Sequence, residues 1–150
     1  MKLQTKYFGE IEYDSEDCFS FPNGLYGFEE EKEFILIPFE GSQSSLLCLQ
    51  STLTPSLSFI LMDPFSLKSD YSPLLQTTEF HALGAEKQDD LCYYVMCVVK
   101  QPVSESTLNL KCPIAINPNT RVSMQVILDS AEYGMRHLLS EFGSEGARVC

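Results

Sequence analysis

The segment at residues 121–128 alternates apolar and polar side chains, and this alternation limits the fold more than any other feature of the chain. Its polar members Arg121, Ser123 and Gln125 fall on one side of an extended strand. Its apolar members fall on the other side, at Val122, Met124, Val126 and Leu128. The pattern predicts a half-exposed strand.

Other segments are apolar on both alternations and rich in aromatic and branched residues. Residues 91–99 show this pattern best, and residues 34–37 and 57–62 are similar. The pattern is typical of strands that are covered on both faces. Further short strands are predicted at residues 3–8, 10–13, 19–21, 46–49 and 107–110. Gly9, Pro22-Asn23-Gly24, Pro55 and Pro102 supply the turns. Together they predict a mostly β fold, a small antiparallel barrel or sandwich.

Only the C-terminal region breaks the two-residue period. Apolar side chains recur there at helical spacing, at Ala131, Met135, Leu138 and Phe142. Asp129 with Glu132 resembles a capping box, and Gly143 stands where a helix would end. We therefore expect one C-terminal helix over residues 130–142.

The chain length favours a single domain. A chain of 150 residues can bury roughly 70% of its unfolded surface, enough for one full core. We expect one domain over residues 1–143, followed by a flexible tail at 144–150 with little apolar content.

Net charge and hydropathy indicate which kind of partner the chain binds and in which cellular compartment it is found. A formal net charge of −11 repels phosphate backbones, so we expect no direct nucleic-acid binding and a basic partner instead. The chain lacks an apolar run of about 18 residues and an apolar N-terminal signal, so we expect no membrane span and a cytoplasmic protein.

Cysteines and histidines give no metal-binding or redox motif. The six cysteines are Cys18, Cys48, Cys92, Cys97, Cys112 and Cys150. We expect most of them to be small buried hydrophobes. Cys92 and Cys97 should point to opposite faces of one strand and so cannot share an ion, and nothing in the spacing joins His81 or His137 to the cysteines. We expect no metal and no cofactor.

Catalytic and phosphate-binding signatures are also missing from the sequence. No local signature of an activated nucleophile surrounds a cysteine or serine, so we expect no enzyme activity. Gly24-Leu25-Tyr26-Gly27 has the glycine spacing of a KH-type loop. The carboxylates that follow it would repel a nucleic-acid backbone, so the segment predicts a turn.

Clustered carboxylates are the first candidates for partner binding. They gather at residues 10–17, 29–33 and 86–90. Such clusters are usually solvated faces, but two that lie close together would steer a cationic partner. The candidates in the second cluster are Glu29, Glu30 and Glu31.

The segment from Asp63 to Tyr71 is the second candidate. Pro64 holds the chain extended and leaves Phe65 and Tyr71 in a loop, where aromatic side chains can anchor a partner. We include Asp63 and Asp70 with them. The alternative is that Phe65 folds back and plugs one end of the barrel.

Residues 109–117 combine strand alternation with proline and asparagine. Asn109, Pro113 and Asn117 belong to the candidate set, but Pro113 cannot donate to a ladder and asparagine tolerates turn conformations. The expectation is that these three residues shape a loop rather than touch a ligand.

Motifs distributed over most of the chain resemble the FliW family of flagellar assembly factors. They are Phe21-Pro22-Asn23-Gly24-Leu25-Tyr26-Gly27-Phe28, Leu49-Gln50-Ser51, Phe59, Asp63-Pro64, Asp70-Tyr71, Asn109-Leu110, Pro113-Ile114, Ile116-Asn117, Arg121, Gln125-Val126-Ile127-Leu128, Tyr133 and Arg136. Cys112, Ala115 and Ser123 depart from the family pattern of alanine, valine and glycine.

The resemblance implies a β-rich barrel-like fold and a binding function. A protein of this family would hold newly made flagellin and also sequester CsrA, the repressor that binds flagellin mRNA. Export of flagellin would then free the protein to capture CsrA and restore translation. The acidic charge of this chain fits a basic RNA-binding partner.

A small-ligand β-barrel is the alternative function. It needs an empty interior, whereas this chain carries many bulky residues, and a cupin-type site needs histidine and carboxylate ligands that are missing.

The cysteine analysis generates a prediction about the native protein. We expect all six cysteines to be reduced and unligated, because a core of this size needs no disulfide framework. Native mass spectrometry with and without chelator and reductant measures this. A persistent zinc adduct, or a mass lower by pairs of hydrogens, contradicts it.

Overall fold

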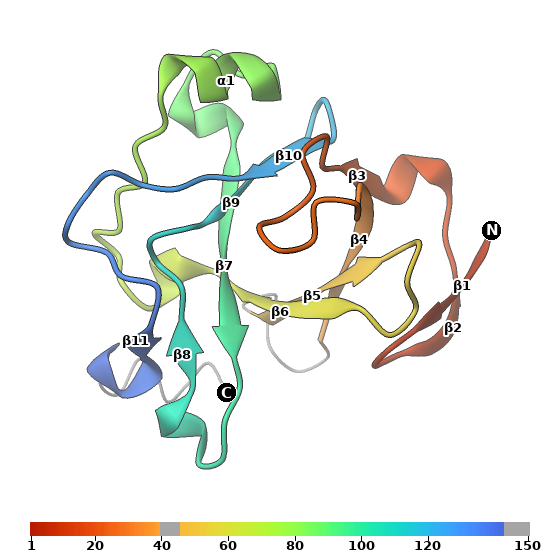
Figure 1. The fold of residues 1–150 in the computed structure, drawn as a ribbon, viewed down its shortest axis with the longest axis horizontal. Helices are drawn as coiled ribbons and strands as arrows, with labels where there is room; N and C mark the ends of the chain where they lie inside the picture. The colour runs from red at the N-terminus through yellow and green to blue at the C-terminus, as the bar shows by residue number, and fades with distance from the viewer. Residues whose placement is uncertain (40–45, 143–150) are drawn as a thin grey trace.

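A computed structural model of the protein describes residues 1–39 and 46–142 (Figure 1). Within this part, seven strands close into a barrel: β3 (Cys18–Ser20), β4 (Glu33–Pro38), β5 (Leu46–Ser51), β6 (Ser58–Met62), β7 (Cys92–Val98), β9 (Ile114–Asn117) and β10 (Val122–Gln125). The circle closes because β7 pairs with both β6 and β9. The predicted barrel class is confirmed. One pairing, β3 with β10, is parallel, whereas an antiparallel barrel was expected.

The remaining elements lie outside the barrel. The hairpin of β1 (Lys2–Thr5) and β2 (Gly9–Glu12) lies at the opposite side of the molecule from β8 (Thr107–Leu108) and β11 (His137–Leu138), which extend the sheet from β7 (Figure 1). The α-helix in the described part of the chain is α1 (Thr77–Leu83). Short 3-10 turns are η1 (Ser15–Asp17), η2 (Pro64–Ser66), η3 (Gln88–Asp90), η4 (Val103–Glu105) and η5 (Leu139–Phe142).

Bulky side chains fill the barrel. Phe21 and Phe34 are fully buried and meet edge to face, with ring centroids 5.2 Å apart. Further members of this cluster come from β5, β6 and β9, and include Leu49, Leu61 and Ile114. A filled interior of this kind stabilises the barrel by apolar burial and disfavours a ligand inside it.

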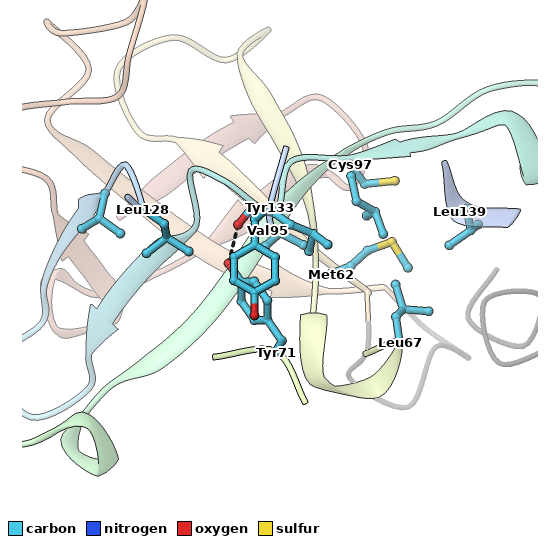
Figure 2. Close-up of a cluster of buried hydrophobic side chains, with 11 residues drawn as sticks. Met62, Leu67, Tyr71, Val95, Cys97, Leu128, Tyr133 and Leu139 are labelled. Atoms are coloured by element: carbon cyan, nitrogen blue, oxygen red, sulfur yellow. Dashed lines mark hydrogen bonds between the residues drawn. The ribbon is translucent and has the colours of Figure 1, made fainter. Parts of the chain in front are cut away.

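A second core lies between β7 and the segments that cover its outer face (Figure 2). Val95 and Cys97 of β7 belong to this core, while Tyr94 and Met96 pack against the barrel interior. The middle of β7 is therefore covered on both faces, as predicted for residues 91–99. Its two ends are exposed at Cys92 and Val98.

The faces of β10 are opposite to the prediction. Ser123 and Gln125 are buried, whereas Val122 and Met124 are half-buried against the cluster that contains α1. The Gln125 side chain is satisfied there because its Nε2 donates to the Cys112 carbonyl (3.3 Å) and its Oε1 accepts from the Tyr26 N–H (3.1 Å). The prediction was therefore wrong for residues 122–125, whose polar side chains are the more buried ones, whereas Val126 and Leu128 are buried as the predicted apolar face required.

The predicted helix over residues 130–142 is wrong. Three positions of its proposed apolar stripe, Ala131, Met135 and Leu138, are exposed. The segment instead makes long-range contacts, since His137 pairs with Leu108 and the Gly134 carbonyl accepts hydrogen bonds from residues 110 and 111. Non-local pairing here overrides local helical periodicity. The expected tail at residues 144–150 lies outside the described residues.

The helix α1 was not predicted, although its boundaries carry sequence signals. Glu79 Oε1 accepts from the Gln76 N–H at 2.7 Å, and Gly84 ends the helix in the left-handed conformation (φ 69°). The helix is short, and only Leu83 is fully buried on it, so its hydrophobic period was too weak to detect.

The segment 24–27 is a turn, as predicted. Gly24 has φ 65°, and a Cβ there would lie 2.6 Å from the Glu29 backbone. Only glycine fits this position without displacing the main chain.

Ser123 generates a stability prediction, because its buried Oγ has no hydrogen-bond partner among the described residues. Ser123→Ala should raise the free energy of unfolding by about 1 kcal/mol by removing an unsatisfied polar group. Urea denaturation followed by circular dichroism measures this change.

Ser106→Ala is the matched control. Ser106 is equally buried, but its Oγ accepts a hydrogen bond from the Lys100 N–H at 2.9 Å. Ser106→Ala should therefore lower the free energy of unfolding by about 1 kcal/mol. Equal losses in both variants would show that the Ser123 hydroxyl has a partner.

Candidate partner-binding surface

The ten candidate residues predicted from the sequence differ widely in exposure. Exposed positions are Glu29, Glu30, Phe65 and Asp70; half-buried positions are Glu31, Asp63 and Asn109; buried positions are Tyr71, Pro113 and Asn117. The structure brings Asp63, Phe65 and Asp70 to one surface, with the buried Tyr71 ring packed against Phe65. The others lie elsewhere.

The loop that follows β6 is built around η2. Asp63 Oδ1 accepts from the Phe65 N–H at 2.9 Å, and buried Pro64 occupies the first position of the turn. This geometry leaves Phe65 39% exposed, so it does not plug the barrel. Asp63 thus orients the loop, and Phe65 presents part of its ring to solvent.

An aromatic row runs beneath this surface. Tyr71 meets Tyr133 at a centroid distance of 4.7 Å and Phe65 at 5.7 Å, and Phe65 meets Tyr93 at 6.3 Å. The Tyr71 hydroxyl donates to the Leu110 carbonyl at 2.6 Å. Burial raises the pKa of Tyr71 strongly and that of Tyr93 to about 12, so both phenols stay neutral at physiological pH.

A groove of about 620 Å³ lies between residues 70–76 and 128–133. Two hydrogen bonds join its walls: Tyr133 Oη accepts from the Ser72 N–H (2.9 Å), and Gln76 Nε2 donates to Asp129 Oδ2 (3.4 Å). Carboxylates line it at Asp70, Asp129 and Glu132, and leucines line it at Leu74, Leu75 and Leu128. The groove therefore offers acidic and apolar contacts together.

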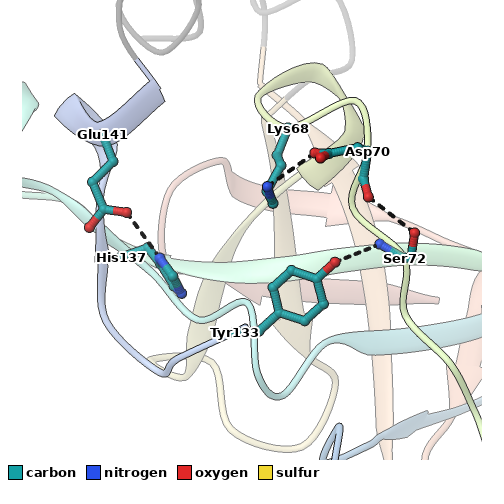
Figure 3. Close-up of polar contacts among 6 residues, drawn as sticks. All are labelled: Lys68, Asp70, Ser72, Tyr133, His137 and Glu141. Carbon is teal, nitrogen blue, oxygen red and sulfur yellow. Dashed lines mark hydrogen bonds and ion pairs between the residues drawn. The ribbon is translucent and has the colours of Figure 1, made fainter. Parts of the chain in front are cut away.

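A second groove of about 440 Å³ shares Asp70 and Glu132 with the first. Lys68 Nζ lies 3.0 Å from Asp70, and His137 Nδ1 lies 3.0 Å from Glu141 Oε2 (Figure 3). These hydrogen bonds lower the pKa of both carboxyls, and the bond to Asp70 raises the pKa of Lys68. The pairs are exposed enough that each contributes little to folding stability.

The acidic cluster at residues 29–33 divides into two kinds of carboxylate. Glu29 and Glu30 are exposed, while the Glu31 carboxylate accepts from the Ser51 hydroxyl and from Thr54 Oγ1 (2.8 Å). Glu31 therefore holds the turn after β5, a role that the sequence did not indicate.

Asn109, Pro113 and Asn117 all make contacts that shape the backbone. Asn109 Oδ1 accepts from the Cys112 N–H at 3.0 Å, and the Pro113 carbonyl accepts from the Val126 N–H at 3.0 Å. Asn117 Nδ2 donates to the Leu83 carbonyl at 2.8 Å, and its Oδ1 accepts from the Asn119 N–H at 3.0 Å. Asn117 thereby joins β9 to the end of α1.

Four of the five described cysteines are buried. Cys92 is exposed while Cys97 is buried, so they lie on opposite faces of β7 as predicted. Burial raises the pKa of Cys18 to about 11 and also raises that of Cys48 and Cys112, which disfavours the reactive thiolate. Within residues 1–39 and 46–142, no group of three His, Cys, Asp or Glu side chains could hold a metal ion.

Several groove residues were missed as binding candidates. Asp129 and Glu132 had been assigned to a helix cap, and Leu74 carried no motif. The sequence carried no signal for Leu74, because its 74% exposed fraction is seen only in the folded chain.

Within the described ranges, no helix has the length and apolar content that a membrane crossing requires.

Comparison with known proteins gives consistent results. A family model described as FliW protein matches residues 2–139. A protein from Geobacillus sp. (strain WCH70), named flagellar assembly factor FliW, is 40% identical over 93% of this chain and 95% of its own length. A protein of the same name from Shouchella clausii is 37% identical over 97% of this chain and 99% of its own length.

A solved structure supports the same relationship. The crystal structure of a flagellar assembly factor FliW superposes with a TM-score of 0.87 at 37% identity, covering 92% of this chain and 96% of that one.

Asn117 generates the prediction of this subsection. Asn117→Val should lower the free energy of unfolding by about 2–3 kcal/mol, because it removes the hydrogen bond to the buried Leu83 carbonyl, which keeps only Thr120 Oγ1 as a donor, and the acceptor of the N–H groups of residues 119 and 120. Thermal and urea denaturation measure the loss.

Asn119→Val is the control, because Asn119 is exposed and only its backbone N–H takes part in this contact. An unchanged melting temperature for Asn117→Val with abolished partner binding would place Asn117 on the contact surface instead.

Proposed function

The chain belongs to the FliW family, and from that membership we propose that it is a flagellar assembly factor that binds flagellin and sequesters CsrA. Flagellin that accumulates occupies the protein and leaves CsrA free to repress flagellin translation. When flagellin is exported, the protein captures CsrA and translation resumes. We propose that this exchange occurs in the cytoplasm, where the mRNA is translated.

The acidic, partly apolar surface around the groove is the observation that carries this proposal. Three carboxylates and three leucines line one groove on a chain of net charge −11. Such a surface suits a protein partner with basic and apolar side chains, since charge complementarity speeds encounter and apolar anchors slow dissociation. The same charge opposes direct binding of nucleic acid.

The proposed activity is binding without catalysis. The buried cysteines have raised pKa values, so they are poor nucleophiles. A small-ligand barrel is less favoured because Phe21, Phe34 and Leu49 fill the interior. We take residues 1–143 as the functional unit, with no cofactor.

Salt dependence separates charge steering from apolar anchoring. We expect Glu29→Lys with Glu30→Lys to weaken binding to purified flagellin or CsrA by about 1.5- to 5-fold per charge. The salt dependence of the affinity should become shallower, because exposed charges are screened over about 8 Å at physiological salt. Glu31 stays unchanged because it holds the 51–54 turn.

Phe65→Ala tests the apolar contribution. An aromatic anchor is worth about 2 kcal/mol or more, so this variant should bind about 30-fold more weakly at every salt concentration. Tyr71→Phe is its control, since Tyr71 is 4% exposed and the change removes only its buried hydroxyl. If the charge reversals leave both affinity and salt slope unchanged for both partners, the acidic charge serves solubility only.

A further inference from the structure

The groove between residues 70–76 and 128–133 combines two chemistries at defined places. Leu74 is 74% exposed, Leu75 is half-buried and Leu128 is buried, so the apolar part runs from rim to floor. Asp129 and Glu132, both exposed, stand on the opposite wall. A ligand that fills this groove must meet an apolar surface and negative charge side by side.

The carboxylates of the groove differ in how far they are already satisfied. Asp70 is paired with Lys68 at 3.0 Å. Asp129 receives only a long hydrogen bond from Gln76 (3.4 Å). The Glu132 carboxylate makes no hydrogen bond or ion pair among the described residues, and its charge acts on Lys68 only as the weakest of several causes that shift the Lys68 pKa. Asp129 and Glu132 therefore keep most of their capacity to accept from an external cation.

The walls of the groove are fixed before any ligand arrives. Tyr133 Oη accepts a hydrogen bond from the Ser72 N–H, and the Tyr71 hydroxyl donates one to the Leu110 carbonyl. Gln88 Nε2 donates to the Pro73 carbonyl at 2.6 Å. A wall held by such bonds loses little conformational entropy on binding, which lowers the free-energy cost of docking a ligand.

Resting on the proposed function, we propose that this groove is the docking site for one segment of the protein partner in which a lysine or arginine lies beside an apolar side chain. The cation lies between Asp129 and Glu132, and the apolar side chain packs on Leu74 and Leu75. Charge complementarity selects this occupant, because a second copy of this chain would bring another net charge of −11.

Two sets of carboxylates then have separate roles. Glu12 of β2 and Glu16 of η1 are exposed. The strand β2 lies on the opposite side of the molecule from β8 and β11, near which the chain of residues 128–133 runs (Figure 1). Distant charges change mainly the association rate, whereas contacts inside a docking site change mainly the dissociation rate.

The test compares two double variants that remove the same two charges. Asp129→Asn with Glu132→Gln alters the groove, and Glu12→Gln with Glu16→Gln alters the far side. Both pairs are exposed, so circular dichroism should show unchanged folding. Association and dissociation rates are measured by surface plasmon resonance on immobilised flagellin and on immobilised CsrA.

We expect the groove variant to raise the dissociation rate from at least one partner by about tenfold or more, while the far-side variant keeps it within about twofold. Leu74→Ser should also speed dissociation, equally at low and high salt. If the two double variants dissociate at the same rate, whether or not that rate differs from the wild-type rate, the groove assignment is wrong. The proposed function would still be supported in that case, because the wild-type protein binds. Absence of wild-type binding to both partners would overturn both proposals.

Discussion

The division of β7 between different partners is the constraint on which the rest of the structure depends. Its first residues pair with β9 and close the barrel, while Cys97 and Val98 pair with β8 outside it. One strand thus ends the barrel and begins the sheet extension. Closure satisfies the backbone of the barrel strands and leaves few unpaired edges, which an open sheet of this size would expose.

The candidate surface follows from this division. β8 holds β11, and β11 brings the chain from residue 129 onward beside the loop that carries Phe65 and Tyr71. The contact of Tyr71 with Tyr133 then packs two segments that are far apart in sequence. The groove exists because the sheet continues past the barrel, and a barrel alone would not form it.

Strand positions were predictable because side-chain period reflects burial directly. The strands β4, β6 and β7 lie where two-sided apolar runs placed them. The absence of a helix at residues 130–142 was not predictable in the same way, since the segment has helical spacing but its residues 137 and 138 pair with β8. The faces of β10 were inverted because Gln125 finds partners inside the barrel that only the folded chain supplies.

The candidate site was predictable only in part. The loop around Phe65 was found because proline and aromatic residues mark it locally, but its partner segment lies some sixty residues further along the chain. Glu31 was a candidate for partner binding whose structural role could not be predicted from the sequence. In the sequence it resembles its exposed neighbours, and only the Ser51 and Thr54 hydroxyls give it a structural role.

The buried amide of Gln125 also affects which barrel the chain can form. β10 meets β3 at the single pair Val122 with Ser20, so the ladder itself specifies that junction weakly. A slip of β10 by one residue would turn Met124 inward and carry Gln125 away from both Tyr26 and Cys112. The amide therefore penalises every misaligned register by leaving buried groups unpaired, and it contributes specificity of strand alignment beyond its own binding energy.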